Sequence, residues 1–158
     1  MSLGKRYNAD WAAIVVGLGG GLTAALYIET VLKNDWMTVY GVVNSVARIC
    51  ALAGSYLAIV GLILVSRISW VERSVGHDRL VIWHRKLGPW SLYLITFHVL
   101  LVLVGYAGND RVKLAVELWR MINRYPWMLP AFVAFIFFAM AGITSYKRVR
   151  KNLSYEAW

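Results

Sequence analysis

Residues 83–106 of the chain read WHRKLGPWSLYLITFHVLLVLVGY, and this stretch decides the fold class. After the polar opening His84-Arg85-Lys86, it carries no charged residue to its end. A helix needs roughly 20 consecutive apolar residues to cross the approximately 30 Å hydrocarbon core of a bilayer. The stretch is therefore predicted to be a membrane-spanning helix.

Three further apolar runs have the same character, at about residues 11–32, 42–66 and 127–146. The whole chain of 158 residues is 59% hydrophobic and 16% charged, whereas soluble domains are closer to half apolar and a quarter charged. The sequence therefore predicts an all-α, polytopic membrane bundle with four transmembrane helices. A cleavable signal peptide is the alternative for the first run. That run is too long for a signal core and lacks a clear cleavage site, which favours a membrane anchor.

Basic residues give the chain a formal net charge of +9, which in a soluble protein would suggest nucleic acid. Here they fall between apolar runs, so we expect the lipid bilayer as partner and no nucleic acid. With the N-terminus inside, eleven lysines and arginines share that side: Lys5, Arg6, Arg67, Arg73, Arg79, Arg85, Lys86, Lys147, Arg148, Arg150 and Lys151. Five lie on the other side: Lys33, Arg111, Lys113, Arg120 and Arg124. This asymmetry predicts a multi-pass protein of the cell membrane with both termini in the cytoplasm.

The connection from residue 108 to residue 125 is predicted to contain a short amphipathic helix on the outer surface, with Asp110 as its N-cap. One helical face carries Val112, Ala115, Val116, Trp119 and Ile122, against Arg111, Lys113, Glu117 and Arg120. Such a helix either covers a site at the outer end of the bundle or is a plain connection. The sequence leaves both interpretations open.

His98 is the residue of the membrane runs that most strongly suggests a function. It lies about midway along the uncharged part of the third run, where an ionisable side chain is costly and usually functional. The alternative is a neutral imidazole that hydrogen-bonds to a neighbouring helix and only packs.

His84 strengthens the functional interpretation through its spacing from His98. The separation of fourteen positions returns the helix to within about 40° of the same face and gives a rise of about 21 Å. Two imidazoles so far apart cannot share one metal ion, but they suit two separate cofactors, one near each leaflet. Imidazole is a common axial ligand of haem iron. We therefore predict that His84 and His98 are iron ligands of two haems, although His84 alone could be an ordinary interfacial histidine.

Arg48 is the one charge inside the second run. It either extends its guanidinium to the outer surface or pairs with an anionic group in the bundle, such as a haem propionate or a substrate. Glu29, near the outer end of the first run, is a possible partner for it or simply interfacial. His77, beside Gly76 and Asp78 in the cytoplasmic connection, is expected to be a solvated loop residue.

Several motifs resemble one known family. The stretch WVERSVGHDRL at residues 70–80, followed by WHRKLG at 83–88, is similar to the core of the ferric reductase-like transmembrane domain, a family that includes ferric reductases and NADPH oxidases. The His-x13-His pair on the third helix is its most specific mark, and His84 and His98 match it. The YPW at 125–127 and the closing LSYEAW at 153–158 are also similar to bacterial members. The resemblance covers most of the chain from the second helix onward.

This resemblance implies a six-helix bundle with two b-type haems, each bound by one histidine of the third helix and one of the fifth. It implies an oxidoreductase in which electrons pass from NAD(P)H through FAD on the cytoplasmic side to the inner haem, then the outer haem, then ferric ion or oxygen. By position His84 would serve the inner haem and His98 the outer one. Arg48 resembles an arginine near the outer haem of the oxidases, where it would steady a propionate or a reduced acceptor.

The chain departs from the family pattern where it stops, at Trp158. The fifth helix would be expected to begin there, and no FAD or nicotinamide domain follows. We therefore expect the N-terminal part of a longer protein, or a partner chain that supplies the missing histidines and the flavin domain. One alternative is a haem-binding membrane subunit that serves a periplasmic reductase. Another is a non-catalytic four-helix scaffold or transport subunit whose histidines only pack or relay protons.

Overall fold

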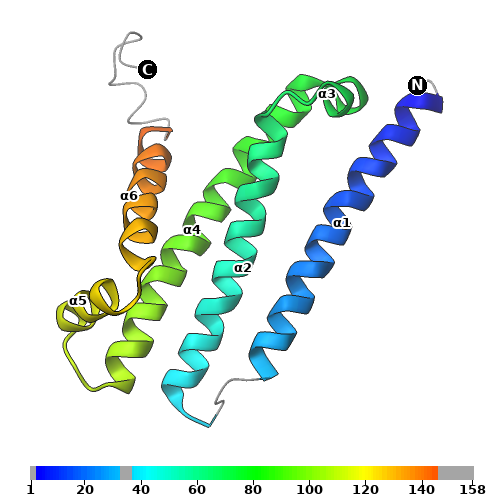
Figure 1. Ribbon diagram of the computed structural model, residues 1–158. Coiled ribbons are helices and arrows are strands. Elements are labelled where there is room, and N and C mark those ends of the chain that lie inside the picture. Colours follow the sequence, from blue (N-terminus) through cyan, green and yellow to red (C-terminus); the bar gives the residue numbers. More distant parts are fainter. Residues whose placement is uncertain (1–2, 33–36, 146–158) are drawn as a thin grey trace.

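The computed structural model describes residues 3–32 and 37–145, and within these residues the chain forms six helices and no strand. In chain order they are α1 (Leu3–Leu32), α2 (Val39–Val65), α3 (Ser69–Val75), α4 (His77–Asn109), α5 (Leu114–Arg124) and α6 (Met128–Ser145), as Figure 1 shows. The predicted all-α helical bundle is confirmed. The basic residues Lys33, Lys147, Arg148, Arg150 and Lys151 and the motif at 153–158 lie outside the described residues.

Three helices in the described part of the chain, α2, α4 and α6, are long and apolar enough to cross a membrane. In α1 the apolar stretch Ala13–Glu29 is shorter, so the fourth span stays a prediction. Large apolar side chains cover the outside of these helices; Leu62 and Phe137, for example, are 67% and 66% exposed. Lipid would cover these side chains in a bilayer, and the chain is therefore a membrane protein.

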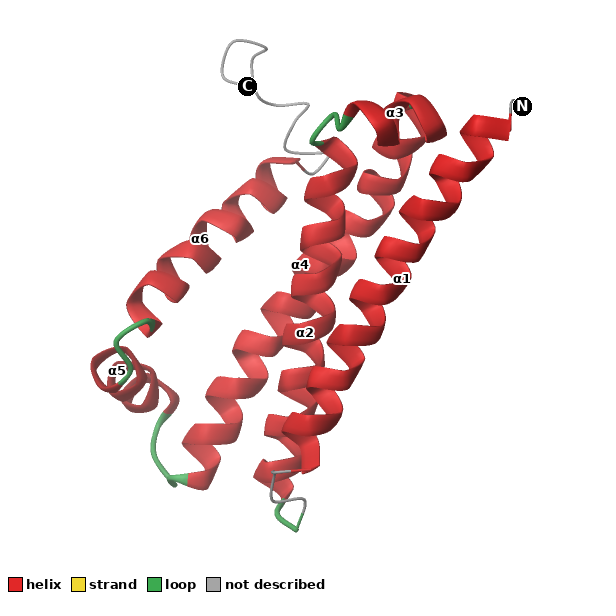
Figure 2. Ribbon diagram, turned by 45° about the vertical axis from the view of Figure 1, so that its right-hand side comes forward, coloured by secondary structure: helices red, strands yellow, loops and turns green. Residues whose placement is uncertain are grey.

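The helices α2 and α4 run antiparallel and pack against each other along their length, and this pair forms the centre of the molecule (Figure 1). Helix α1 packs on α2 and α3, whereas α6 contacts α4 and α5. The beginning of α1 and the end of α6 lie at the same end of the bundle as α3, which we name the α3 end. The opposite end, where α5 crosses the direction of the long helices, is the α5 end (Figure 2). The charge asymmetry predicts that the α5 end faces outward.

Small residues let α2 and α4 approach closely. Ala47, Gly54 and Gly61 recur at every seventh position of α2, and Ala47 is fully buried. A Cβ added at Gly54 would lie 2.9 Å from the Cγ1 atom of Ile95 and 3.1 Å from its backbone nitrogen. Glycine and alanine at such positions are typical of helix pairs that pack in membranes.

The prediction that His77 lies in a loop is wrong, because it is the first residue of α4. Gly76 has a φ of 91°, a left-handed conformation that glycine adopts at little cost. This single residue ends α3 and begins α4, so no loop separates the two helices. The His77 ring is 41% exposed, and its Nδ1 atom lies 3.7 Å from the carboxylate of Glu72.

The predicted amphipathic helix is present as α5, but the prediction that Asp110 is its N-cap is wrong. Helix α4 continues to Asn109, and Asp110 is its C-cap, with its N–H bonded to the carbonyl of Tyr106 at 2.9 Å. Arg111, with a φ of 54°, then turns the chain. Helix α5 begins only at Leu114, and its N-cap residue Lys113 makes no side-chain hydrogen bond.

Candidate functional site

His98 is held against α2 by one of its two ring nitrogens. Its Nδ1 atom lies 2.8 Å from the carbonyl oxygen of Ala47. A carbonyl oxygen can only accept a hydrogen bond, so Nδ1 carries the proton and donates it. In the neutral imidazole the Nε2 atom then keeps its lone pair, which is the form in which imidazole binds a metal.

His84 repeats this arrangement fourteen residues earlier on α4. Its Nδ1 atom lies 3.0 Å from the carbonyl oxygen of Gly61, and Gly61 stands fourteen residues after Ala47 on the antiparallel helix. Metal-binding histidines characteristically donate their second ring N–H to a carbonyl or carboxylate, which fixes the tautomer and the ring orientation. Both rings are thus held in the same orientation by the same kind of hydrogen bond to α2.

The Nε2 atom is the second ring nitrogen of each histidine, and a metal would bind there. Both side chains are only half-buried in the described structure, and neither Nε2 atom is among the buried atoms that lack a hydrogen-bond partner. Among the described residues, the Nδ1 bonds are the only hydrogen bonds of His84 and His98. Both Nε2 atoms therefore remain available to a ligand.

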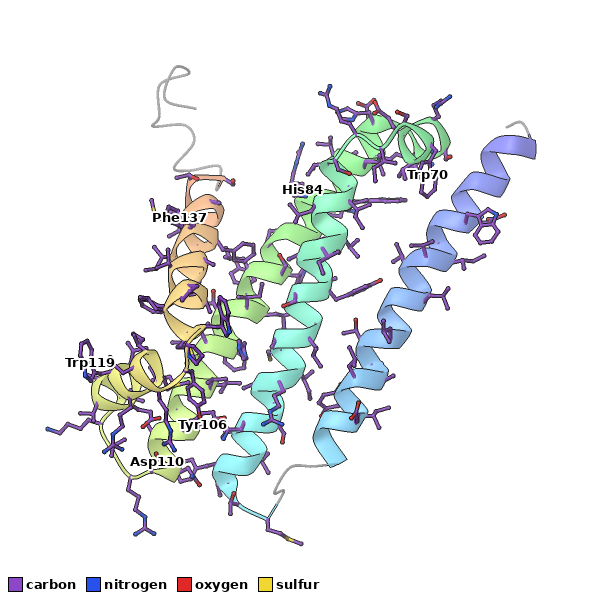
Figure 3. All side chains as sticks on the ribbon, in the orientation of Figure 1. Trp70, His84, Tyr106, Asp110, Trp119 and Phe137 are labelled. Carbon is purple, nitrogen blue, oxygen red and sulfur yellow. The ribbon has the colours of Figure 1, made fainter. Side chains whose placement is uncertain are left out.

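A cavity of about 320 Å³ opens beside His98 toward the α5 end. Helices α2, α4 and α6 and the end of α5 contribute its lining: Asn44, Arg48, His98, Val102, Tyr106, Met121, Tyr125 and Met128. The structure thus brings Arg48 and His98 to one cavity, whereas His84 lies far from it, near the α3 end (Figure 3). Met121 of α5 and the C-cap residue Tyr125 take part in this lining.

The sequence interpretation missed several residues of this cavity. Asn44 stands one helical turn before Arg48, and its buried Oδ1 atom has no hydrogen-bond partner in the described structure. His98, Val102 and Tyr106 follow one another at every fourth position of α4. This i, i+4 spacing was the available signal, whereas nothing local in the sequence marked Met121 or Tyr125.

His84 and His98 fit a cofactor in which most ligands of the metal belong to the cofactor itself. Within the described ranges, no three histidine, cysteine, aspartate or glutamate side chains gather around a common point to hold a metal ion. Each of the two histidines can therefore supply a single axial ligand. This is what haem iron requires, since the macrocycle already provides four nitrogens.

The fold defines an integral membrane helical bundle, and two histidines of one helix make equivalent hydrogen bonds to the neighbouring helix. The family model for the ferric reductase like transmembrane component matches residues 50–158, and the chain belongs to this family. Transmembrane electron transfer, an oxidoreductase function and haem binding are general properties of such domains. Both histidines lie within the matched range and Arg48 lies just before it. Neither the curated proteins nor the solved structures include a significant match.

Proposed function

We propose that this chain is the membrane part of a reductase that passes electrons one at a time across the bilayer. The donor would be a cytoplasmic flavin reduced by NAD(P)H, and the acceptor would be ferric ion or oxygen at the outer face. Two b-type haems would connect them. Membership in the ferric reductase-like family and the two prepared histidines support this proposal.

His84 would bind the inner haem and His98 the outer one, each through its Nε2 atom. Bound haem would supply a one-electron redox centre, and its chemistry belongs to the cofactor. The chain would hold and orient the group, exclude water from it and adjust its potential. Arg48, which lines the His98 cavity, would steady a propionate. The second axial ligands and the flavin and nicotinamide sites would come from later helices or a partner chain.

One observation carries most of the proposal: the two histidines make equivalent bonds to carbonyl oxygens on the same neighbouring helix, at 2.8 and 3.0 Å. The antiparallel register of α2 and α4 gives both rings the same tautomer and the same orientation, fourteen residues apart. Two ligands that are held by the same bond and lie about 21 Å apart along one helix suit two equivalent redox centres in opposite leaflets.

A reduced-minus-oxidised visible spectrum of the protein, purified from haem-replete cells together with any following sequence, tests the proposal. We expect the α-band of six-coordinate b-type haem. A colourless protein would refute the proposal and favour a non-catalytic scaffold. If the protein shows the band but reduces ferric ion or oxygen only when a second protein is added, a membrane subunit of a periplasmic reductase becomes the better interpretation.

A further inference from the structure

The inward face of α5 carries a buried acid that the proposed electron transfer does not use. Glu117 is only 4% exposed, and its Oε2 atom has no hydrogen-bond partner within the described structure. In contrast, Leu114, Val116 and Trp119 on the same helix are 50%, 43% and 70% exposed. A buried carboxyl oxygen without a partner is costly, so a bound molecule that donates to it would stabilise this arrangement.

Glu117 lines a second cavity, of about 600 Å³, between α5 and the last turn of α4. This volume lies within the range of roughly 300–1,000 Å³ that is common for small-molecule sites. The cavity adjoins the one beside His98, because Tyr106, Met121 and Tyr125 line both. Figure 3 shows Tyr106 and Asp110 at the end of α4 that lies beside α5.

The charges of this second cavity are mixed. Arg120 and Arg124 stand three and seven residues after Glu117, on the same face of α5, and both line the cavity together with the exposed Asp110. Among the described residues, the Oε2 atom of Glu117 accepts no hydrogen bond from either arginine. A simple anion would meet the Glu117 carboxyl, and a simple cation would meet two guanidinium groups. A ligand that carries both an anionic group and a hydrogen-bond donor suits all three side chains.

We propose that this cavity binds a small organic acid that carries a protic donor, a hydroxyl or an ammonium group, beside its carboxylate. The donor would bond to Oε2 of Glu117, while Arg120 and Arg124 would bind the carboxylate, as guanidinium groups do with strong, charge-assisted hydrogen bonds. Binding of this kind does not depend on electron transfer. If the proposed function holds as well, the position beside the His98 cavity makes this the entry for the outer acceptor.

Three acids with the same four-carbon dicarboxylate skeleton test the proposal: L-malate with a hydroxyl, L-aspartate with an ammonium group, and succinate with neither. Their affinities are measured by isothermal titration calorimetry on the oxidised protein in lipid nanodiscs. We expect malate or aspartate to bind about tenfold more tightly than succinate, as one hydrogen bond to a charged group allows. The tighter of the two identifies the donor as hydroxyl or ammonium.

Variants assign the effect to the named residues. Glu117→Met removes the acceptor oxygen, so we expect it to abolish the preference over succinate. Arg120→Gln combined with Arg124→Gln should weaken all three acids alike. Lys113→Gln removes an exposed charge just before the same helix, outside the cavity, and should change nothing.

Two results with the wild-type protein would overturn the proposal. Either none of the acids binds it at millimolar concentration, or succinate binds as tightly as both others. A preference that survives in Glu117→Met would overturn it too. The comparison of ligands on the wild-type protein remains decisive even if a variant fails to fold. Since no turnover is involved, a missing haem spectrum would refute the proposed function and leave this result unaffected.

Discussion

The Nδ1 atom of His98 lies 2.8 Å from the carbonyl oxygen of Ala47, and His84 makes the equivalent bond of 3.0 Å to Gly61. Both acceptors are on α2 and both donors on α4, so one helix–helix register fixes both rings. A shift of α2 along α4 by a single residue, about 1.5 Å, would disturb both bonds together. The packing of this helix pair is therefore part of the functional site.

Replacing one histidine should remove one haem. In the protein purified together with any following sequence, His98→Leu is expected to lose the haem of the α5 end and keep the other, because the two imidazoles are about 21 Å apart and act separately. Haem content is measured by the pyridine haemochrome assay and should fall by about half. His84→Leu should give the complementary loss.

His77→Leu is the control for these variants, because its ring is 41% exposed and contacts Glu72 rather than α2. It should keep the full haem content. Loss of both haems in His98→Leu, with the fold intact by circular dichroism, would contradict the assignment of one histidine to each haem.

Gly54→Ala should separate α2 from α4. The added Cβ would lie 3.1 Å from the backbone nitrogen of Ile95, and backbone atoms cannot move aside cheaply. We expect overpacking to destabilise the protein by about 1–3 kcal/mol, seen as a lower Tm by circular dichroism in detergent. Haem occupancy should fall as well, since both histidine bonds cross this interface.

Gly88→Ala is the matched control, because a Cβ at Gly88 of α4 would meet nothing within 4 Å. It should leave the Tm unchanged or raise it slightly, since alanine favours a helix over glycine by about 0.5–1 kcal/mol. Equal effects of the two substitutions would show that the α2–α4 contact is not tightly packed at Gly54.

The sequence predicted the helices well because length and apolarity are local properties. It also singled out His98 and Arg48, since a charged or titratable group inside an apolar run is visible without any structure, and His84 through its spacing from His98. Their roles as haem-binding residues remain predictions. The seven-residue helix α3 and the start of α4 at His77 depend on the backbone conformation of Gly76, which the sequence pattern does not specify.

The sequence did not reveal the carbonyl partners of the histidines or the burial of Glu117. Which α2 carbonyl faces each ring depends on the relative register of two helices, and a single helix contains no information about it. The amphipathic pattern of α5 showed two faces, but not which of them turns toward α4. In a membrane protein the apolar face can turn outward, because lipid covers it.

Replacing Arg48 should change the midpoint potential of one of the two proposed haems. Arg48 lines the same cavity as His98, so Arg48→Met removes a positive charge beside the proposed outer haem and stabilises its oxidised form. We expect the midpoint potential of that haem to fall by on the order of 50 mV, or ~1 kcal/mol, measured by spectroelectrochemical titration. Arg48→Lys keeps the positive charge, so its midpoint potential should stay close to that of the wild-type protein. A similar fall for both haems would show that the charge does not act locally.

The orientation of the bundle can be tested with two matched substitutions in a Cys50→Ser background. Asp110 lies at the α5 end and Asp78 in the first turn of α4 at the α3 end, and both are exposed. Because the side richer in lysine and arginine stays in the cytoplasm, Asp110→Cys should react with a membrane-impermeant maleimide on intact cells. Asp78→Cys should react only after the membrane is permeabilised. The reverse pattern would place the α3 end outside and would invert the proposed direction of electron transfer.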